Sequence, residues 1–157
     1  MKFVPIHVHS TCGSIADSAA KVKDIVSKAK AIGAPGCSLT DHGSMSASLK
    51  FYKECKKQGI NPIIGVELYV NNNRDFKDKT NRKNHHICLY AKNFQGYKDL
   101  IWLQGEAVHH FYSKPRSTNE LIFQKAKSGN LICTTACLGS EFNHLFEQGK
   151  TDEAEEL

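Results

Sequence analysis

The sequence predicts an α/β fold in which strands alternate with helices, as in a parallel sheet or a barrel of βα units. Short apolar runs rich in β-branched residues recur along the chain, and segments with apolar residues at helical spacing lie between them. Glycines and polar turns separate the two kinds of segment. The 157 residues are 40% hydrophobic and 24% charged, which suffices for one globular domain with its own core.

The first strand is expected at 2–8, an apolar run that ends in polar residues. A helix at 19–32 follows, because its apolar residues recur at helical spacing. Asp17 or Ser18 can cap the start of this helix, and Gly33 stops it.

A short buried strand at 36–40 leads into a second helix, which Ser44 or Ser46 starts and Gly59 ends. The run PIIGVELYV at 62–70 predicts a third strand, because it is rich in β-branched residues.

The polar stretch at 71–84 is expected to form a loop, at a hairpin or at a strand crossover. The later elements continue the alternation, with strands at 87–91 and 131–135 and helices at 94–110, at 141–148 and from 151 onward. A short helix with Leu121, Ile122 and Phe123 is expected between Ser117 or Thr118, which caps it, and Gly129, which ends it. Five strands are fewer than a closed eight-stranded barrel of about 250 residues needs. The sheet is therefore either open or part of a larger barrel.

The composition of the chain indicates in which compartment the protein works and what kind of partner it binds. No apolar run approaches the roughly 20 residues of a spanning helix, and the N-terminus lacks the apolar stretch of a secretory signal. We therefore expect a cytoplasmic protein with no membrane partner. Six cysteines without a CxxC pair argue against a disulfide framework there. The net charge of +5, with five cations at 74–83, suits a phosphate-bearing partner, although solvated Lys-rich surfaces are common.

Metal-binding side chains recur at the ends of the predicted strands. His7 and His9 point to one side of a strand because they are two residues apart. Asp41 and His42 end the second strand, and Glu67 is a carboxylate within an otherwise apolar third strand. Such a carboxylate needs a partner or a metal ion if both faces of the sheet are covered.

Three further candidates complete this pattern. His85 and His86 open the fourth strand, and at most one of them can join the site because neighbours point to opposite faces. Cys137 follows the fifth strand, where a buried thiol is the plainer interpretation for the residue taken alone.

Imidazole and carboxylate donors together suit Zn²⁺, Mn²⁺ or Fe²⁺. Two or three such ions held together would act on a phosphate ester. Lys114 and Arg116 add cations that could attract the phosphate, and a solvated turn explains them equally well.

These residues lie in stretches that resemble the polymerase-and-histidinol-phosphatase (PHP) domain family, and within it the N-terminal PHP domains of DNA polymerase III alpha subunits from bacteria or phages. The matching stretches follow one another in order along nearly the whole chain. They are HVH at 7–9, TDHG at 40–43, KFYKECKKQGI at 50–60, PIIGVELYV at 62–70, HICLYAKN at 86–93, QGY at 95–97, Tyr112 with KPR at 114–116, and ACLGSE at 136–141.

The resemblance implies a distorted (β/α)₇ barrel, of which this chain supplies roughly the first five βα units. Residues 1–157 would then be the N-terminal part of a PHP domain, without the strands that complete it. The family's late Asp-x-His ligand pair has no counterpart here. We therefore expect metal binding but weak or no catalysis by this chain alone.

By position, the resemblance implies seven metal ligands: His7, His9, Asp17, His42, Glu67, His86 and Cys137. Asp17 is assigned by allowing one inserted residue, since the usual spacing falls on Ala16. The catalytic assignments are Asp41, which would orient a ligand from behind, and Arg116, which would offset the charge of the phosphate.

Three functions follow. The first is the PHP portion of a replicative polymerase alpha subunit, with metal-dependent 3′→5′ exonuclease chemistry on the primer end of DNA. The second is a small-molecule phosphoesterase of the histidinol-phosphatase type. The third is a non-catalytic module that needs the remainder of the subunit, or a complementing chain, to cover its open sheet edge.

Overall fold

The computed structural model describes residues 3–72, 83–111 and 113–157. Its strands are β1 Gly36–Leu39, β2 Asn61–Val70, β3 His85–Ala91, β4 Arg116–Ser117 and β5 Leu131–Thr134. Its helices are α1 Val22–Ala31, α2 Ser48–Gln58, α3 Phe94–His109, α4 Asn119–Ala126, α5 Glu141–Glu147 and α6 Thr151–Glu155. The α/β class is confirmed, and the elements predicted from residue 19 onward occur in the expected order, with the two-residue strand β4 as an addition.

The sheet is mixed rather than parallel. Strand β2 pairs in parallel with β1 and β4, and antiparallel with β3, which in turn pairs antiparallel with β5. Only β3 therefore runs against the other four strands. The prediction of a parallel sheet was wrong for β3, which pairs antiparallel with both of its neighbours. Of the two connections left open for 71–84, the pairing selects the hairpin; the loop prediction for 73–82 lies outside the described residues.

The expected first strand is an irregular extended segment. Residues 3–10 form no strand, but Ser38 donates to the Pro5 carbonyl at 2.9 Å and Thr40 donates to the Val8 carbonyl at 2.8 Å. Pro5 has no N–H to donate, and Val8 donates to the Thr40 hydroxyl (3.0 Å) instead of a main-chain carbonyl. The segment still lies along β1, so it delivers His7 and His9 to the end of that strand.

Both early helices begin later than expected. The N-cap of α1 is Lys21 rather than Asp17 or Ser18; the Ser18 hydroxyl lies in the loop before the helix, where it donates to the His9 carbonyl (2.8 Å) and accepts from the Ala20 amide (3.1 Å). The N-cap of α2 is Ala47 rather than Ser44 or Ser46. The predicted ends hold: the glycines that follow α1 and α2 both have positive φ.

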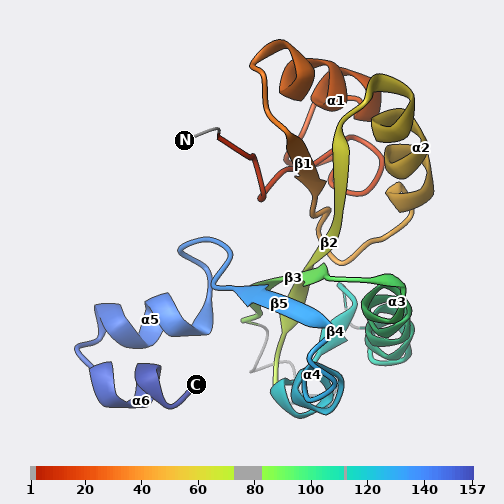
Figure 1. The fold of residues 1–157 in the computed structure, drawn as a ribbon. Coiled ribbons are helices and arrows are strands. Elements are labelled where there is room, and N and C mark those ends of the chain that lie inside the picture. The colour runs from red at the N-terminus through yellow and green to blue at the C-terminus, as the bar shows by residue number, and fades with distance from the viewer. Residues whose placement is uncertain (1–2, 73–82, 112) are drawn as a thin grey trace.

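Two apolar cores lie along β2 (Figure 1). The first packs α1, α2 and β1 around the fully buried Phe51 and Val26. The second packs α3 and α4 against β2 and β3, around Leu100 and Leu103. Helices α5 and α6 pack on each other away from the sheet, and α5 buries no side chain completely. No helix in the described ranges is both long and apolar enough to cross a bilayer.

The N-cap of α4 gives a modest prediction. The Thr118 hydroxyl accepts a hydrogen bond from the Leu121 amide at 3.3 Å. Replacing Thr118 with alanine removes this acceptor and is expected to lower the free energy of unfolding by about 1 kcal/mol. Thr118→Ser keeps the hydroxyl and should change stability far less. Equal losses for the two variants, measured by urea unfolding, would contradict the capping role.

Candidate metal centre

The Glu67 carboxylate is the hub of a cluster of imidazoles. Glu67 lies in the half of β2 beyond β1 and is 1% exposed. Its Oε2 atom lies 2.8 Å from His7 Nε2 and 3.2 Å from His9 Nε2. His42 Nδ1 lies 3.3 Å from the same oxygen, and His86 Nδ1 lies 3.2 Å from Oε1. Four histidines from three separate segments of the chain therefore converge on one buried carboxylate.

The histidine rings pack on one another as well. His9 stacks on His42 with ring centroids 4.4 Å apart, and the Nε2 atoms of His7 and His9 lie 3.1 Å apart. Tyr69 borders the cluster, because its ring stacks on His42 at 5.7 Å and meets His86 edge-on at 5.0 Å. This packing restricts the orientation of the imidazoles.

The two remaining ligand candidates, Asp17 and Cys137, also reach the cluster. Asp17 Oδ2 lies 3.0 Å from His42 Nε2, on a side chain that is 56% exposed. Cys137 Sγ lies 3.5 Å from His86 Nδ1 and accepts a hydrogen bond from the Gly139 amide. All seven expected ligand side chains thus contact another member of the set. Their roles as ligands stay a prediction.

His85 turns away from this cluster, as the alternation of a strand requires. Its ring lies 5.7 Å from that of His144 on α5, and burial lowers its pKa. Of the two histidines that open β3, the structure therefore brings His86 to the site and not His85.

Asp41 lies behind the cluster and holds the loop that carries part of it. Its carboxylate accepts hydrogen bonds from the Ser10 amide (2.6 Å), the Ser10 hydroxyl (2.7 Å) and the Ser14 hydroxyl (3.2 Å). Ser14 Oγ also accepts from the His42 amide at 2.9 Å and lies 3.4 Å from His9 Nδ1. This arrangement agrees with an orienting role, which remains a prediction.

The same loop wraps closely around Asp41. A Cβ added at Gly13 would lie 2.6 Å from the Asp41 Cβ atom, so only glycine fits there. Residues 10–14 are therefore shaped by the buried aspartate as much as by their own sequence.

Arg116 lies beside the cluster on the neighbouring strand. It is 1% exposed and pairs in register with Tyr69, and residues paired in register point to the same face of a sheet. Since Tyr69 faces His42 and His86, Arg116 is on the face of the sheet that carries the site. Whether its charge acts on a substrate stays a prediction.

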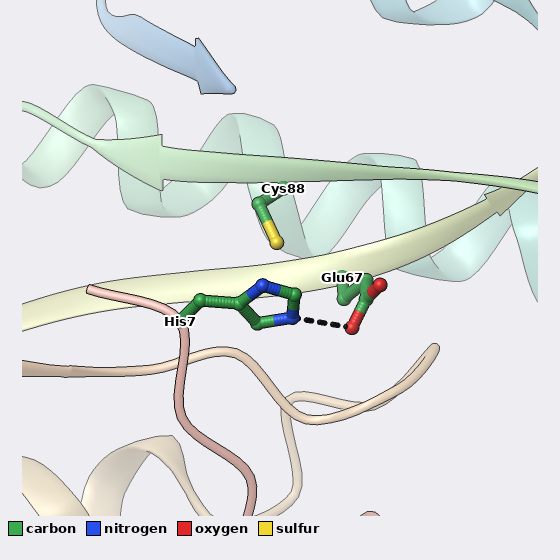
Figure 2. Close-up of side chains that lie close together, drawn as sticks. All are labelled: His7, Glu67 and Cys88. Carbon is green, nitrogen blue, oxygen red and sulfur yellow. Dashed lines mark hydrogen bonds and ion pairs between the residues drawn. The ribbon is translucent and has the colours of Figure 1, made fainter. Parts of the chain in front are cut away.

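Cys88 is a neighbour of the site that the sequence reasoning missed. Its thiol, the His7 imidazole and the Glu67 carboxylate offer ligand atoms within 4.8 Å of one another (Figure 2). Cys88 is in register with Glu67 and two residues beyond His86, so it shares their face. The His-x-Cys spacing at 86–88 was the available signal. Burial raises the pKa of this thiol to about 12.

Electrostatics couple the cluster. Burial alone would raise the pKa of Glu67, but hydrogen bonds from His86, His9 and His7 outweigh it and hold that pKa well below its usual range. The hydrogen bond to Glu67 raises the pKa of His9, and burial lowers the pKa of His42. One carboxylate thus faces several imidazoles that differ in their affinity for a proton.

The donor set fits divalent metal ions. Within the described ranges, three overlapping groups of possible ligands occur: His7 with Glu67 and Cys88, His9 with His42 and Glu67, and Glu67 with His86 and Cys137. Among the described residues, the buried atoms Glu67 Oε1 and His42 Nδ1 make no well-formed hydrogen bond. Each lies only within ion-pair distance of a group in the cluster, Oε1 of His86 and Nδ1 of the Glu67 carboxylate. A metal ion would satisfy lone pairs that the protein leaves unmet.

A mixed α/β sheet with histidine, carboxylate and thiol groups gathered at one centre defines an α/β domain with a candidate metal site. The profile of the PHP domain matches residues 5–157, and this chain belongs to that family. The resemblance seen in the sequence is therefore confirmed.

Curated relatives point to one kind of protein. The chain is 40% identical over 157 residues to the DNA polymerase III subunit alpha of Borreliella burgdorferi, covering 98% of this chain and 13% of the relative. It is 40% identical over 160 residues to that of Treponema pallidum (99% and 13%). It is 38% identical over 143 residues to that of Campylobacter jejuni (90% and 12%). The chain thus spans about an eighth of the length of these relatives.

Among solved structures, an amidohydrolase from Chromobacterium violaceum, with bound sulfate and no metal, is similar with a TM-score of 0.47 and 18% identity. The match covers 68% of this chain and 34% of that one.

Proposed function

We propose that this chain is the PHP portion of a DNA polymerase III alpha subunit and that its donor cluster holds divalent metal ions for phosphodiester hydrolysis at the 3′ end of a primer. The observation that carries the proposal is the convergence of four imidazoles on the buried Glu67 carboxylate, in a chain 38–40% identical to the alpha subunits of the three bacteria named above. We also propose that residues 1–157 are the N-terminal part of a single PHP domain. The rest of the subunit, or a complementing chain, would complete the barrel.

The ligands would be the seven predicted side chains, and Cys88 is a neighbour that could replace one of them. Bound Zn²⁺, Mn²⁺ or Fe²⁺ ions, two or three in number, would supply Lewis acidity and an activated water for the reaction. Glu67 would contribute to holding the ions, because both of its oxygens face imidazoles that are themselves candidate ligands. Its low pKa keeps it ionised at neutral pH.

The protein groups around the ligands would do the positioning. Asp41 would fix the loop behind His9 through Ser10 and Ser14. Arg116 would offset the charge of the phosphate from the adjacent strand. Lys114 donates to the Tyr69 hydroxyl at 2.9 Å and lies over the Tyr69 ring, so it brings a second cation to the border of the cluster.

Metal content tests the proposal. The purified chain is expected to bind Zn²⁺ or Mn²⁺, and His42→Ala should lose most of that binding because it removes a ligand in contact with both Glu67 and Asp17. His144→Ala, which changes a histidine on α5 outside the cluster, is the matched control. Equal metal content in both variants would refute the site.

A nuclease assay with Mn²⁺ separates the functions. A 5′-labelled primer should be shortened slowly or not at all by the chain alone, with any activity lost in His9→Ala. Efficient hydrolysis of phosphomonoesters without any action on the primer would instead favour the small-molecule phosphoesterase.

The affinity for metal ions is expected to fall as the pH is lowered. A proton on His9 must leave before the nitrogen can bind a metal ion, and the contact with Glu67 raises the pKa of His9. The affinity should therefore begin to fall at a higher pH than the usual imidazole value of about 6.5 would give. Titrations from pH 8 to pH 6 check this, and a constant affinity over that range would contradict it.

A further inference from the structure

A hollow lies on the face of β2 opposite the donor cluster. Glu67 and Tyr69 face the cluster, whereas Pro62 and Ile64, at even positions of the same strand, form the floor of a groove of about 470 Å³. Helix α2 and the start of α3 form its walls, and these helices lie one after the other along β2 (Figure 1). We call it the α2–α3 groove; the residues that matter here are Leu49, Tyr52, Pro62, Ile64, Phe94 and Tyr97.

The fold leaves large apolar side chains exposed around this groove. Phe94 is 70% exposed, Leu49 61% and Tyr52 44%. None of them belongs to either apolar core. A cluster of such side chains around one hollow is typical of a binding surface, whereas isolated exposed residues need no explanation.

Each exposed ring carries a lysine one helical turn further on. Lys56 Nζ lies 5.6 Å from the Tyr52 ring centroid on α2, and Lys98 Nζ lies 4.9 Å from that of Phe94 on α3. Tyr97 extends the aromatic surface, with its ring 6.1 Å from that of Phe94 at an interplanar angle of 24°. The same ring-and-lysine pair is thus presented from both walls.

The charge of the groove has one sign. Its lining includes Lys92 and contains no carboxylate. On the adjacent turn of α2, Glu54 is engaged by the Gln58 amide at 2.7 Å. Exposed rings that each hold a lysine ammonium over one face, in a groove whose lining has no carboxylate, are complementary to a ligand that is aromatic and anionic at short intervals.

We propose that the α2–α3 groove binds a single-stranded polynucleotide, with bases on the Tyr52 and Phe94 rings and phosphates at Lys56 and Lys98. Base–aromatic stacking with flanking cations is the usual basis of sequence-tolerant single-strand binding. A duplex keeps its bases stacked on each other and cannot use the rings. An acidic peptide would use the cations but has no repeated flat groups, so it fits the paired rings less well.

The site is independent of the metal centre, because the two lie on opposite faces of β2. The test therefore uses the full chain in EDTA, with fluorescein-labelled dT₁₅ and U₁₅, a 15-base-pair duplex and a poly-glutamate peptide as probes. Fluorescence anisotropy should show both single strands binding and the duplex binding more weakly. Loss of metal binding in the cluster would leave this result unchanged, so the two proposals fail separately.

Two variants locate the binding. Phe94→Ala is expected to weaken dT₁₅ binding about tenfold, within the range for losing one stacked base. The double variant Lys56→Gln/Lys98→Gln should make the slope of log affinity against log salt shallower by about 1.4, since each single-strand phosphate contact contributes about 0.7. Lys125→Gln, which removes a lysine 4.1 Å from the Trp102 ring outside the groove, is the matched control.

Equal binding by the native chain and both groove variants would overturn the proposal. So would tighter binding of the duplex than of dT₁₅, or binding of poly-glutamate alone in a Phe94-dependent manner, which would assign the groove to an acidic protein segment. Because Phe94 is largely exposed, its truncation should leave thermal unfolding unchanged, and a weakened variant can be attributed to the groove.

Discussion

Replacing Glu67 with glutamine is expected to lower the affinity of this chain for divalent ions by more than about 100-fold, which exceeds the usual cost of losing a partner behind a ligand. Glutamine has nearly the same shape but no charge, so the four imidazoles would lose the anion on which they converge. Isothermal titration with Zn²⁺ and Mn²⁺ measures the change.

The matched control is Glu147→Gln on α5, an exposed carboxylate outside the cluster. Glu67→Gln should also lower the observed pKa of His9, because the contact with Glu67 raises it in the native chain. An NMR titration of the His9 ring follows this shift. Native-like metal affinity in Glu67→Gln would show that the carboxylate is structural only.

Replacing Asp41 with alanine is expected to lower the free energy of unfolding by about 3 kcal/mol. The 2% exposed carboxylate accepts three hydrogen bonds, and removing it would leave buried donors of Ser10 and Ser14 unpaired. Urea unfolding of the metal-free chain measures this change without any contribution from bound ions.

The same variant tests how Asp41 acts on the site. If Asp41 positions the loop behind His9 and His42, metal affinity should fall about 10- to 100-fold in conditions where the chain remains folded. Asp41→Asn keeps one carbonyl oxygen and should lose less on both measurements. Lost stability with unchanged metal affinity would limit Asp41 to a structural role and contradict its assignment as a positioning residue.

Strand-end histidines and acids were sufficient to predict most of the cluster. His7, His9, His42, Glu67 and His86 could be grouped because each lies at an end of an apolar run or inside one. The reversal of β3 was not predictable from periodicity, since parallel and antiparallel strands have the same spacing of apolar residues. That reversal places the beginning of β3, and hence His86, beside the carboxyl ends of its neighbours.

The missed features depend on tertiary contacts. Cys88 is in an apolar run that resembles any buried strand; its spacing from His86 was a weak signal, and its register with Glu67 is what brings it beside the carboxylate. Ser18 is a residue type that favours N-caps, but it lies in the loop before α1. Its hydroxyl donates there to the His9 carbonyl of the extended segment. Local preference was overridden in both places by the geometry around the donors.

The position of β2 between the two apolar cores has a consequence for cooperativity. His9 and His42 come from segments attached to the first core, whereas His86 and Cys137 come from the second. A metal ion held by ligands from both segments would link the two cores, which are otherwise joined mainly by β2. A free metal concentration of 100 times the dissociation constant would add about 2.7 kcal/mol to the free energy of unfolding. The two halves of the chain should then unfold as one unit rather than in succession.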